Sequence, residues 1–136
     1  MIEQLEIILN PQVRGYHLIT NELLQQLPPL PAVGILCLFI QHTSAGLTIN
    51  ENADPDVRLD FEQIFNRLIP ENLPYIVHTS EGPDDMPAHI KAAIIGCSLQ
   101  IPISQHQLNL GIWQGIYLCE FRNEARARKI VATILC

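Results

Sequence analysis

Alternation of apolar and polar residues predicts most of the strands in this chain. Residues 2–9 show mixed alternation and are expected to form a strand. The segment "GLTIN" at 46–50 alternates with a period of two, which is typical of a strand with one polar face. The run "AVGILCLFIQH" at 32–42 is rich in large apolar residues, so we expect a buried strand there. Further strands are expected in "CSLQIPIS", "LGIWQGIYLCEF" and "RKIVATILC", at residues 97–104, 110–121 and 128–136.

Helices are predicted where a capping residue precedes apolar residues at helical spacing. Thr20 or Asn21 can cap a short helix that runs to Leu27, where the prolines of "LPPLP" end it. Asp54 followed by Pro55 marks a second helix start, because aspartate accepts hydrogen bonds from the free amides and proline fits the first turn.

The second helix should present one apolar stripe to the core and end at Pro70. The stripe consists of Val57, Phe61, Ile64, Phe65 and Leu68. A third helix should begin in "DDMPAH", with Asp84 or Asp85 as its cap and Gly96 as its stop. Short strands with two or three interspersed helices predict a single α+β domain over residues 1–136.

Composition narrows the classes of partner. The net charge is −6 and the chain has only eight Lys and Arg residues, which argues against a nucleic-acid or anionic-membrane surface. The four cysteines form no CxxC pair, and the start "MIEQLEIILN" lacks the basic segment of a signal peptide. The longest apolar run, "VGILCLFI", is too short to span a membrane. We therefore expect a cytoplasmic protein with reduced thiols.

Three histidines are candidates for chemistry because polar residues flank each of them. His42 lies in "HTS", His78 in "HTSEG" and His89 at the end of "DDMPAH". Three imidazoles with an open fourth position would suit Zn²⁺ if the fold brought them together. Spacing alone favours the other interpretation, in which the three are unrelated, half-buried histidines.

The acidic turn "EGPDDMP" places Glu81, Asp84 and Asp85 close together. Clustered carboxylates need a cation or hydrogen-bond donors, so a Mg²⁺ site is one interpretation and a solvated, helix-capping loop is the other. In "NENADP", Asn50, Asn52 and Asp54 are spaced by two and would point the same way on an extended segment, where the amides could bind a polar ligand. The other interpretation is a polar turn with a helix cap at Asp54.

The segment "GIWQGIY" holds two further candidates. Trp113 could stack on a heterocycle, although a core or interface tryptophan is the commoner case, and Gln114 follows it directly. No Gly-rich phosphate loop and no GxSxG motif occur, which leaves Ser44 a weak candidate for a nucleophile.

Together, "HTSAGLTINENADPDVRLDFE", "EGPDDMPAHIKAAIIGCSLQIPI" and "LGIWQGIYLCEFR" resemble the YjbQ-like family, also called secondary thiamine-phosphate synthase. The resemblance covers nearly the whole chain. It implies an α+β sandwich of about seven strands that assembles as a homotrimer with clefts between subunits. It also implies weak thiamine-phosphate synthase activity, as some members have.

The resemblance assigns the candidate residues to one site. The catalytic candidates are His42, His78, Asp85 and Glu120. The substrate-binding candidates are Thr43, Ser44, Asn50, Asn52, Glu81, Asp84, Trp113, Gln114 and Arg122. The metal ligands expected for Zn²⁺ or Mg²⁺ are His42, His78 and His89. Members commonly carry Glu-His-Arg at the end of the last motif, whereas this chain has Phe121 between Glu120 and Arg122.

Three functions remain open from the sequence. The first is a thiamine-phosphate synthase reaction, in which aminopyrimidine methyl diphosphate and thiazole phosphate are joined and pyrophosphate is released. The second is a metal-dependent hydrolase or lyase of a small phosphorylated metabolite. The third is a non-catalytic trimer that binds a metabolite, which the departure at Phe121 motivates.

Overall fold

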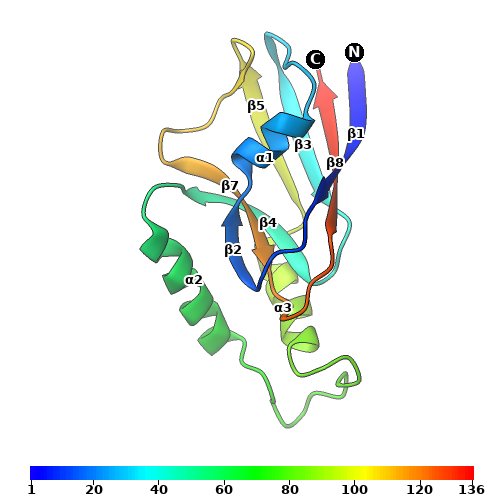
Figure 1. Cartoon of the computed structure of the whole chain (residues 1–136), viewed down its shortest axis with the longest axis vertical. Coiled ribbons are helices and arrows are strands. Elements are labelled where there is room, and N and C mark those ends of the chain that lie inside the picture. The colour runs from blue at the N-terminus through cyan, green and yellow to red at the C-terminus, as the bar shows by residue number, and fades with distance from the viewer.

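The computed structural model describes all 136 residues and contains two antiparallel sheets (Figure 1). The five-stranded sheet has the order β1-β8-β3-β5-β6 and the three-stranded sheet has the order β2-β7-β4. The strands of the larger sheet are β1 (Ile2–Leu9), β3 (Val33–Ile40), β5 (Ser98–Ser104), β6 (Gln107–Leu108) and β8 (Arg128–Leu135). The strands of the smaller sheet are β2 (Gly15–Leu18), β4 (Ala45–Glu51) and β7 (Gln114–Glu120).

Three helices complete the predicted α+β fold: α1 (Thr20–Gln26), α2 (Pro55–Leu68) and α3 (Asp85–Ile95). Asp54 caps α2 as expected, because its Oδ1 accepts a hydrogen bond of 2.9 Å from the amide of Asp56. The predicted cap of α1 is wrong. Its N-cap is Ile19, and Thr20 lies inside the helix, where its hydroxyl oxygen accepts from the amide of Ile116 instead.

The elements form three layers. The main apolar core lies between the two sheets, with Leu36, Leu38 and Ile40 of β3 among its fully buried members. A second apolar cluster, which includes Tyr16, Phe121 and Ala88, lies on the other face of the three-stranded sheet, beneath α2 and α3. The three-stranded sheet is therefore the middle layer, and its strand ends lie close to the helices.

Two burial predictions need correction. The strand at 32–42 is not buried throughout, because Phe39 is 48% exposed on the outer face of the five-stranded sheet. Helix α2 turns Phe61 and Phe65 toward the second cluster, but Ile64 and Leu68 of the predicted stripe are exposed. Both errors have one cause: the pattern shows that a residue is apolar, but it does not show which layer covers it.

The predicted strand at 110–121 begins later, at Gln114. The preceding residues form a turn in which the amide of Gln114 donates to the carbonyl oxygen of Gly111 and the amide of Gly111 donates to Oε1 of Gln114. This turn leaves Trp113 exposed. None of the three helices combines the length and apolar character needed to cross a membrane.

Candidate functional site

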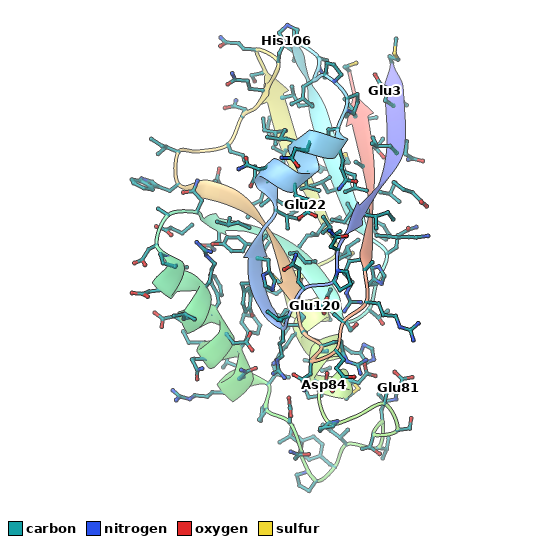
Figure 2. All side chains as sticks on the ribbon, viewed as in Figure 1. Glu3, Glu22, Glu81, Asp84, His106 and Glu120 are labelled. Carbon is teal, nitrogen blue, oxygen red and sulfur yellow. The ribbon has the colours of Figure 1, made fainter.

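A polar cluster lies at the end of the molecule opposite the chain termini, where α3 begins. Figure 2 shows Glu81 and Asp84 at this end, and Glu3 and His106 at the other. The loop before α3 turns back at Gly82, whose φ of 105° is a conformation that glycine adopts at little cost. The loop thereby brings His78 beside the first turns of α3, where Asp85 and His89 share one face because they are four residues apart.

The Asp85 carboxylate is the centre of the cluster. Its side chain is 1% exposed, and its Oδ2 lies 2.6 Å from Nε2 of His78 and 3.0 Å from Nε2 of His89. Its Oδ1 accepts a hydrogen bond of 2.5 Å from Nη1 of Arg122. The ligand atoms of His78, Asp85 and His89 all lie within 4.8 Å of one another. Two imidazoles and one carboxylate therefore converge on one point.

The hydrogen bonds of His89 assign its tautomer. Its Nδ1 lies 2.8 Å from the carbonyl oxygen of Thr43, which can only accept, so Nδ1 must carry a proton. In a neutral ring Nε2 is then unprotonated and has nothing to donate to the carboxylate 3.0 Å away. Either the ring is charged, or a cation belongs between Nε2 and the oxygen of Asp85. A backbone carbonyl that holds the second ring nitrogen is the arrangement usual for histidines that bind metals.

Each nitrogen of the Arg122 guanidinium donates to a neighbouring group. Its Nε donates to Asp84 at 2.9 Å, its Nη1 to Asp85, and its Nη2 to the carbonyl oxygen of Glu81 at 2.9 Å. Asp84 is the N-cap residue of α3, as predicted, but its carboxylate makes no capping hydrogen bond and instead accepts from the amide of Asn123. Burial would raise the pKa of Asp84, but these hydrogen bonds outweigh it and hold the pKa below its ordinary value.

The pKa of Asp85 is also lowered. Burial is the largest influence and would raise it, but the hydrogen bond with His78 and the charges of His89 and Arg122 together outweigh burial. The carboxylate therefore stays ionised at neutral pH, which is the form that binds a cation.

Glu120, expected to be catalytic, is buried and bonded to Arg128 and to the backbone amide of Arg122, not to Asp85 or the histidines. It is 0% exposed and forms a two-point ion pair with Arg128, with distances of 2.7 Å from Nε to Oε1 and 2.5 Å from Nη2 to Oε2. The same Nη2 donates to the hydroxyl of Ser44 at 3.0 Å. The ion pair thus fixes the chain next to Thr43, whose carbonyl oxygen holds His89.

His42 lies near the cluster but is not among its converging atoms. Its Nε2 accepts a hydrogen bond of 2.8 Å from the amide of Lys129, so in the neutral ring Nδ1 carries the proton. Burial and then the charge of Arg128 hold the pKa of His42 below its ordinary value. His42 and Thr43 line a cavity of about 550 Å³ on the His89 side of the cluster.

The structure places Asn50, Asn52, Trp113 and Gln114 at the far ends of β4 and β7. Register shows this, since Ala45 pairs with Glu120 at the near end and Glu51 pairs with Gln114 at the other. Seven residues of strand span roughly 20 Å. Asn52 donates to the carbonyl oxygens of Ile112 and Gln114 and so holds the turn. Within one chain these four residues do not reach the histidines.

Phe121 points away from the cluster although Arg122 points into it. Its ring is 1% exposed, and the ring centroid lies 6.0 Å from that of Tyr16 and 6.4 Å from that of Phe65. The ammonium of Lys91 lies 5.9 Å from the centroid of the Phe121 ring. Neighbouring residues of an extended chain point to opposite sides. A histidine at this position would therefore belong to the second apolar cluster and not to the site.

Two contributors escaped the sequence analysis: the carbonyl oxygen of Thr43 and the guanidinium of Arg128. A backbone carbonyl leaves no trace in residue type. Residue type hides the role of Arg128, because Arg126 and Lys129 close to it make this stretch look like an exposed basic segment.

The UPF0047 protein YjbQ-like family model matches residues 5–136 of this chain. The chain is 50% identical to a UPF0047 protein YjbQ of Salmonella typhimurium, with 96% of both chains covered. It is 47% identical to a UPF0047 protein YjbQ of Escherichia coli O157:H7, again with 96% of both covered. A crystal structure of an uncharacterised conserved YjbQ/UPF0047 family protein from Clostridium acetobutylicum is similar, with a TM-score of 0.80, 36% identity and coverage of 96% of this chain and 99% of the other. The chain therefore belongs to the UPF0047 protein YjbQ-like family.

Proposed function

We propose that this protein is a metal-dependent enzyme that acts on a small phosphorylated metabolite, with the metal held by His78, Asp85 and His89. The observation that carries the proposal is the position of Oδ2 of Asp85, which lies between two Nε2 atoms at 2.6 and 3.0 Å. Nδ1 of His89 carries a proton, so in the neutral ring its Nε2 is free to bind a cation. A cation would satisfy all three atoms at once.

The donor set indicates which metals to expect. Imidazole nitrogens suit zinc and iron, whereas Mg²⁺ prefers oxygen ligands and retained waters. Two histidines and one carboxylate leave open positions for substrate or water. Zn²⁺ therefore replaces Mg²⁺ as the favoured ion at His78, Asp85 and His89.

The charges around the site support a role in phosphate binding through the metal. Arg122 is neutralised by Asp84 and Asp85, and Arg128 by Glu120, so neither guanidinium is free to bind an anion. A divalent ion held by the histidines and Asp85 would supply Lewis-acid stabilisation of negative charge on a phosphate or diphosphate.

The first candidate reaction is of the thiamine-phosphate synthase type. The bond between the methylene carbon and the diphosphate oxygen breaks, and its electron pair leaves on the diphosphate. The thiazole nitrogen uses its lone pair to form the new carbon–nitrogen bond, and pyrophosphate is released. This chemistry requires positioning and stabilisation of the leaving diphosphate, and it requires no strong base.

The second candidate is hydrolysis or elimination on a phosphorylated metabolite. The histidine-rich donor set favours it, because such sites activate water at neutral pH. The two candidates share the metal and differ in the second reactant, which is thiazole phosphate in one case and water in the other.

Metal content tests the site itself. We expect about one equivalent of zinc per chain in the wild-type protein, and a loss of at least about tenfold in affinity in His78→Ala and His89→Ala. His106→Ala is the matched control, because His106 lies at the opposite end of the molecule (Figure 2). Equal metal content in the wild type and all three variants would refute the proposal.

Activity assays then separate the reactions. Zinc-loaded protein is incubated with aminopyrimidine methyl diphosphate, with and without thiazole phosphate, and both thiamine phosphate and free pyrophosphate are quantified. Product that needs both substrates supports the synthase, whereas pyrophosphate without thiazole phosphate supports the hydrolase. Binding without turnover in any combination would favour a non-catalytic metabolite-binding protein.

Assembly and compartment complete the proposal. Exposed apolar residues on the outer face of the five-stranded sheet, among them Ile8, Ile35 and Phe39, support association of copies, for which a homotrimer is our proposal. All four cysteines are free, which supports a reducing, cytoplasmic compartment.

A further inference from the structure

A cavity of about 550 Å³ adjoins the proposed metal site on the side of His89. Its floor comes from α3 and the residues after it, where Ala92, Ala93 and Gly96 line it, and its opposite wall from His42 and Thr43. The volume falls within the range typical of small-molecule sites. The cavity is large enough for the organic part of a metabolite whose phosphate lies at the metal.

The cavity is held open by close contacts between α3 and the sheets. The amides of Ile40 and Leu47 donate to the carbonyl oxygens of Cys97 and Gly96, at 2.9 and 3.1 Å. A Cβ at Gly46 would lie 2.9 Å from the carbonyl oxygen of Gly96, so β4 approaches the end of α3 as closely as glycine allows. Small side chains on this fixed frame leave space that larger ones would fill.

The charges lining this cavity differ from those of the metal cluster. No Asp, Glu, Lys or Arg is among its eight lining residues. A charged group placed there would be partly desolvated without a partner, so the cavity favours an uncharged ligand group.

His42 provides the polar contact. The amide of Lys129 occupies Nε2, which leaves Nδ1–H as the ring's free donor, and Nδ1 has no hydrogen-bond partner within the chain. The burial and the Arg128 charge that lower the pKa of His42 keep its ring neutral. This N–H can donate to a heteroaromatic nitrogen or a carbonyl oxygen, and a neutral acceptor of this kind suits a cavity whose lining holds no charged residue.

We infer that this cavity is the subsite for an uncharged, flat organic group of the substrate, and that the Nδ1–H of His42 donates a hydrogen bond to an acceptor on that group. This inference rests on the proposed function, because the metal site is what anchors the phosphate of the same molecule. His42 thus determines specificity and is not a metal ligand.

Three phosphate esters separate the parts of the inference when their binding to zinc-loaded protein is measured by calorimetry. Methyl phosphate offers only the phosphate group that the metal would bind. Benzyl phosphate adds a flat ring, and aminopyrimidinylmethyl phosphate adds ring nitrogens that can accept. We expect affinity to rise at least about tenfold from methyl to benzyl phosphate, because apolar ring area is buried. A further rise of about five- to tenfold is expected for the aminopyrimidine, from one hydrogen bond.

Variants assign each gain to its residue. Ala93→Leu, at an exposed position of α3, should fill the cavity and remove the gain of both ring compounds over methyl phosphate, whereas Ala93→Ser should keep it. His42→Ala should remove only the gain of the aminopyrimidine over benzyl phosphate, and His42→Asn, whose amide can donate from a similar place, should restore part of it.

The outcomes distinguish this inference from the proposed function. Equal affinities for the three esters in zinc-loaded wild-type protein would overturn the subsite while leaving the metal site in place. So would variants of Ala93 and His42 that bind all three esters as the wild type does. Failure to bind zinc, or failure of the zinc form to bind methyl phosphate, would refute the proposed function first and the subsite with it.

Discussion

The buried ion pair of Glu120 and Arg128 gives a stability prediction that can be worked from the structure. Arg128→Met removes the guanidinium and leaves the Glu120 carboxylate without its partner at a position that is 0% exposed. Breaking a buried pair on one side usually costs about 3–5 kcal/mol. The variant can reduce this cost by protonating Glu120, which from an ordinary pKa near 4.3 costs about 3.7 kcal/mol at pH 7. The two estimates agree, so we expect a loss of about 4 kcal/mol at pH 7.

The pH dependence of this loss follows from the same reasoning. In Arg128→Met the native state holds a proton on the carboxyl group of residue 120 that the unfolded chain does not hold, so the native state gains stability as pH falls. The loss of stability should therefore shrink as pH falls toward the ordinary pKa of a glutamate side chain, to about 1 kcal/mol at pH 5. Wild-type protein, in which Glu120 is paired, serves as the reference at both pH values.

Urea denaturation followed by circular dichroism measures the effect at one fixed protein concentration. With a slope of about 2 kcal/mol per molar urea, the midpoint at pH 7 should fall by about 2 M. The double variant Glu120→Leu/Arg128→Met should recover most of the loss, because two apolar side chains leave no buried charge. A loss below about 1 kcal/mol at pH 7, or one of equal size at pH 5, would refute this account of the pair.

Three further predictions follow from other contacts. Phe121→His should destabilise the fold by about 1–3 kcal/mol, because it places an imidazole beside Tyr16, but it should leave zinc content unchanged in metal analysis. NMR titration of His42 should give a pKa below 6.5, and a value above 6.5 would contradict the burial argument. The stability of the fold should decrease as pH falls through that range, because the unfolded chain binds the proton more tightly. If copies form the proposed trimer through the outer sheet face, the wild type should have the mass of a trimer in light scattering and Phe39→Glu that of a monomer. An unchanged trimer would place the interface elsewhere.

The elements of the fold were predictable because their signals are local. Asp54 followed by Pro55 determines the start of α2 within two residues, and the period of two in "GLTIN" places β4. Layering was not predictable in the same way. Phe39 and Leu38 are equally apolar, and only the assembled sheets decide that one is exposed while the other is buried.

The part of the candidate site that lies on one segment, Asp85 and His89, was predictable from the sequence. The interval between Asp85 and His89 is one helical turn, so a helix beginning in "DDMPAH" places both on one face. The other half depends on which strand ends meet. His42 precedes β4 and Asn50 lies near the end of that strand, and both are polar, but the length of the strand separates them.

The contrast between Phe121 and Arg122 decides how a departure from the family pattern should be interpreted. By sequence the two are neighbours in one motif, so a change at residue 121 suggested an altered site. In the structure they separate, since the guanidinium of Arg122 binds Asp84 and Asp85 while the ring of Phe121 packs among other aromatic rings. A substitution at residue 121 therefore acts on packing beneath α2 and α3, and the atoms proposed to bind a metal remain in place. The phenylalanine is thus no argument against the proposed metal site, and the case for or against catalysis rests on His78, Asp85 and His89.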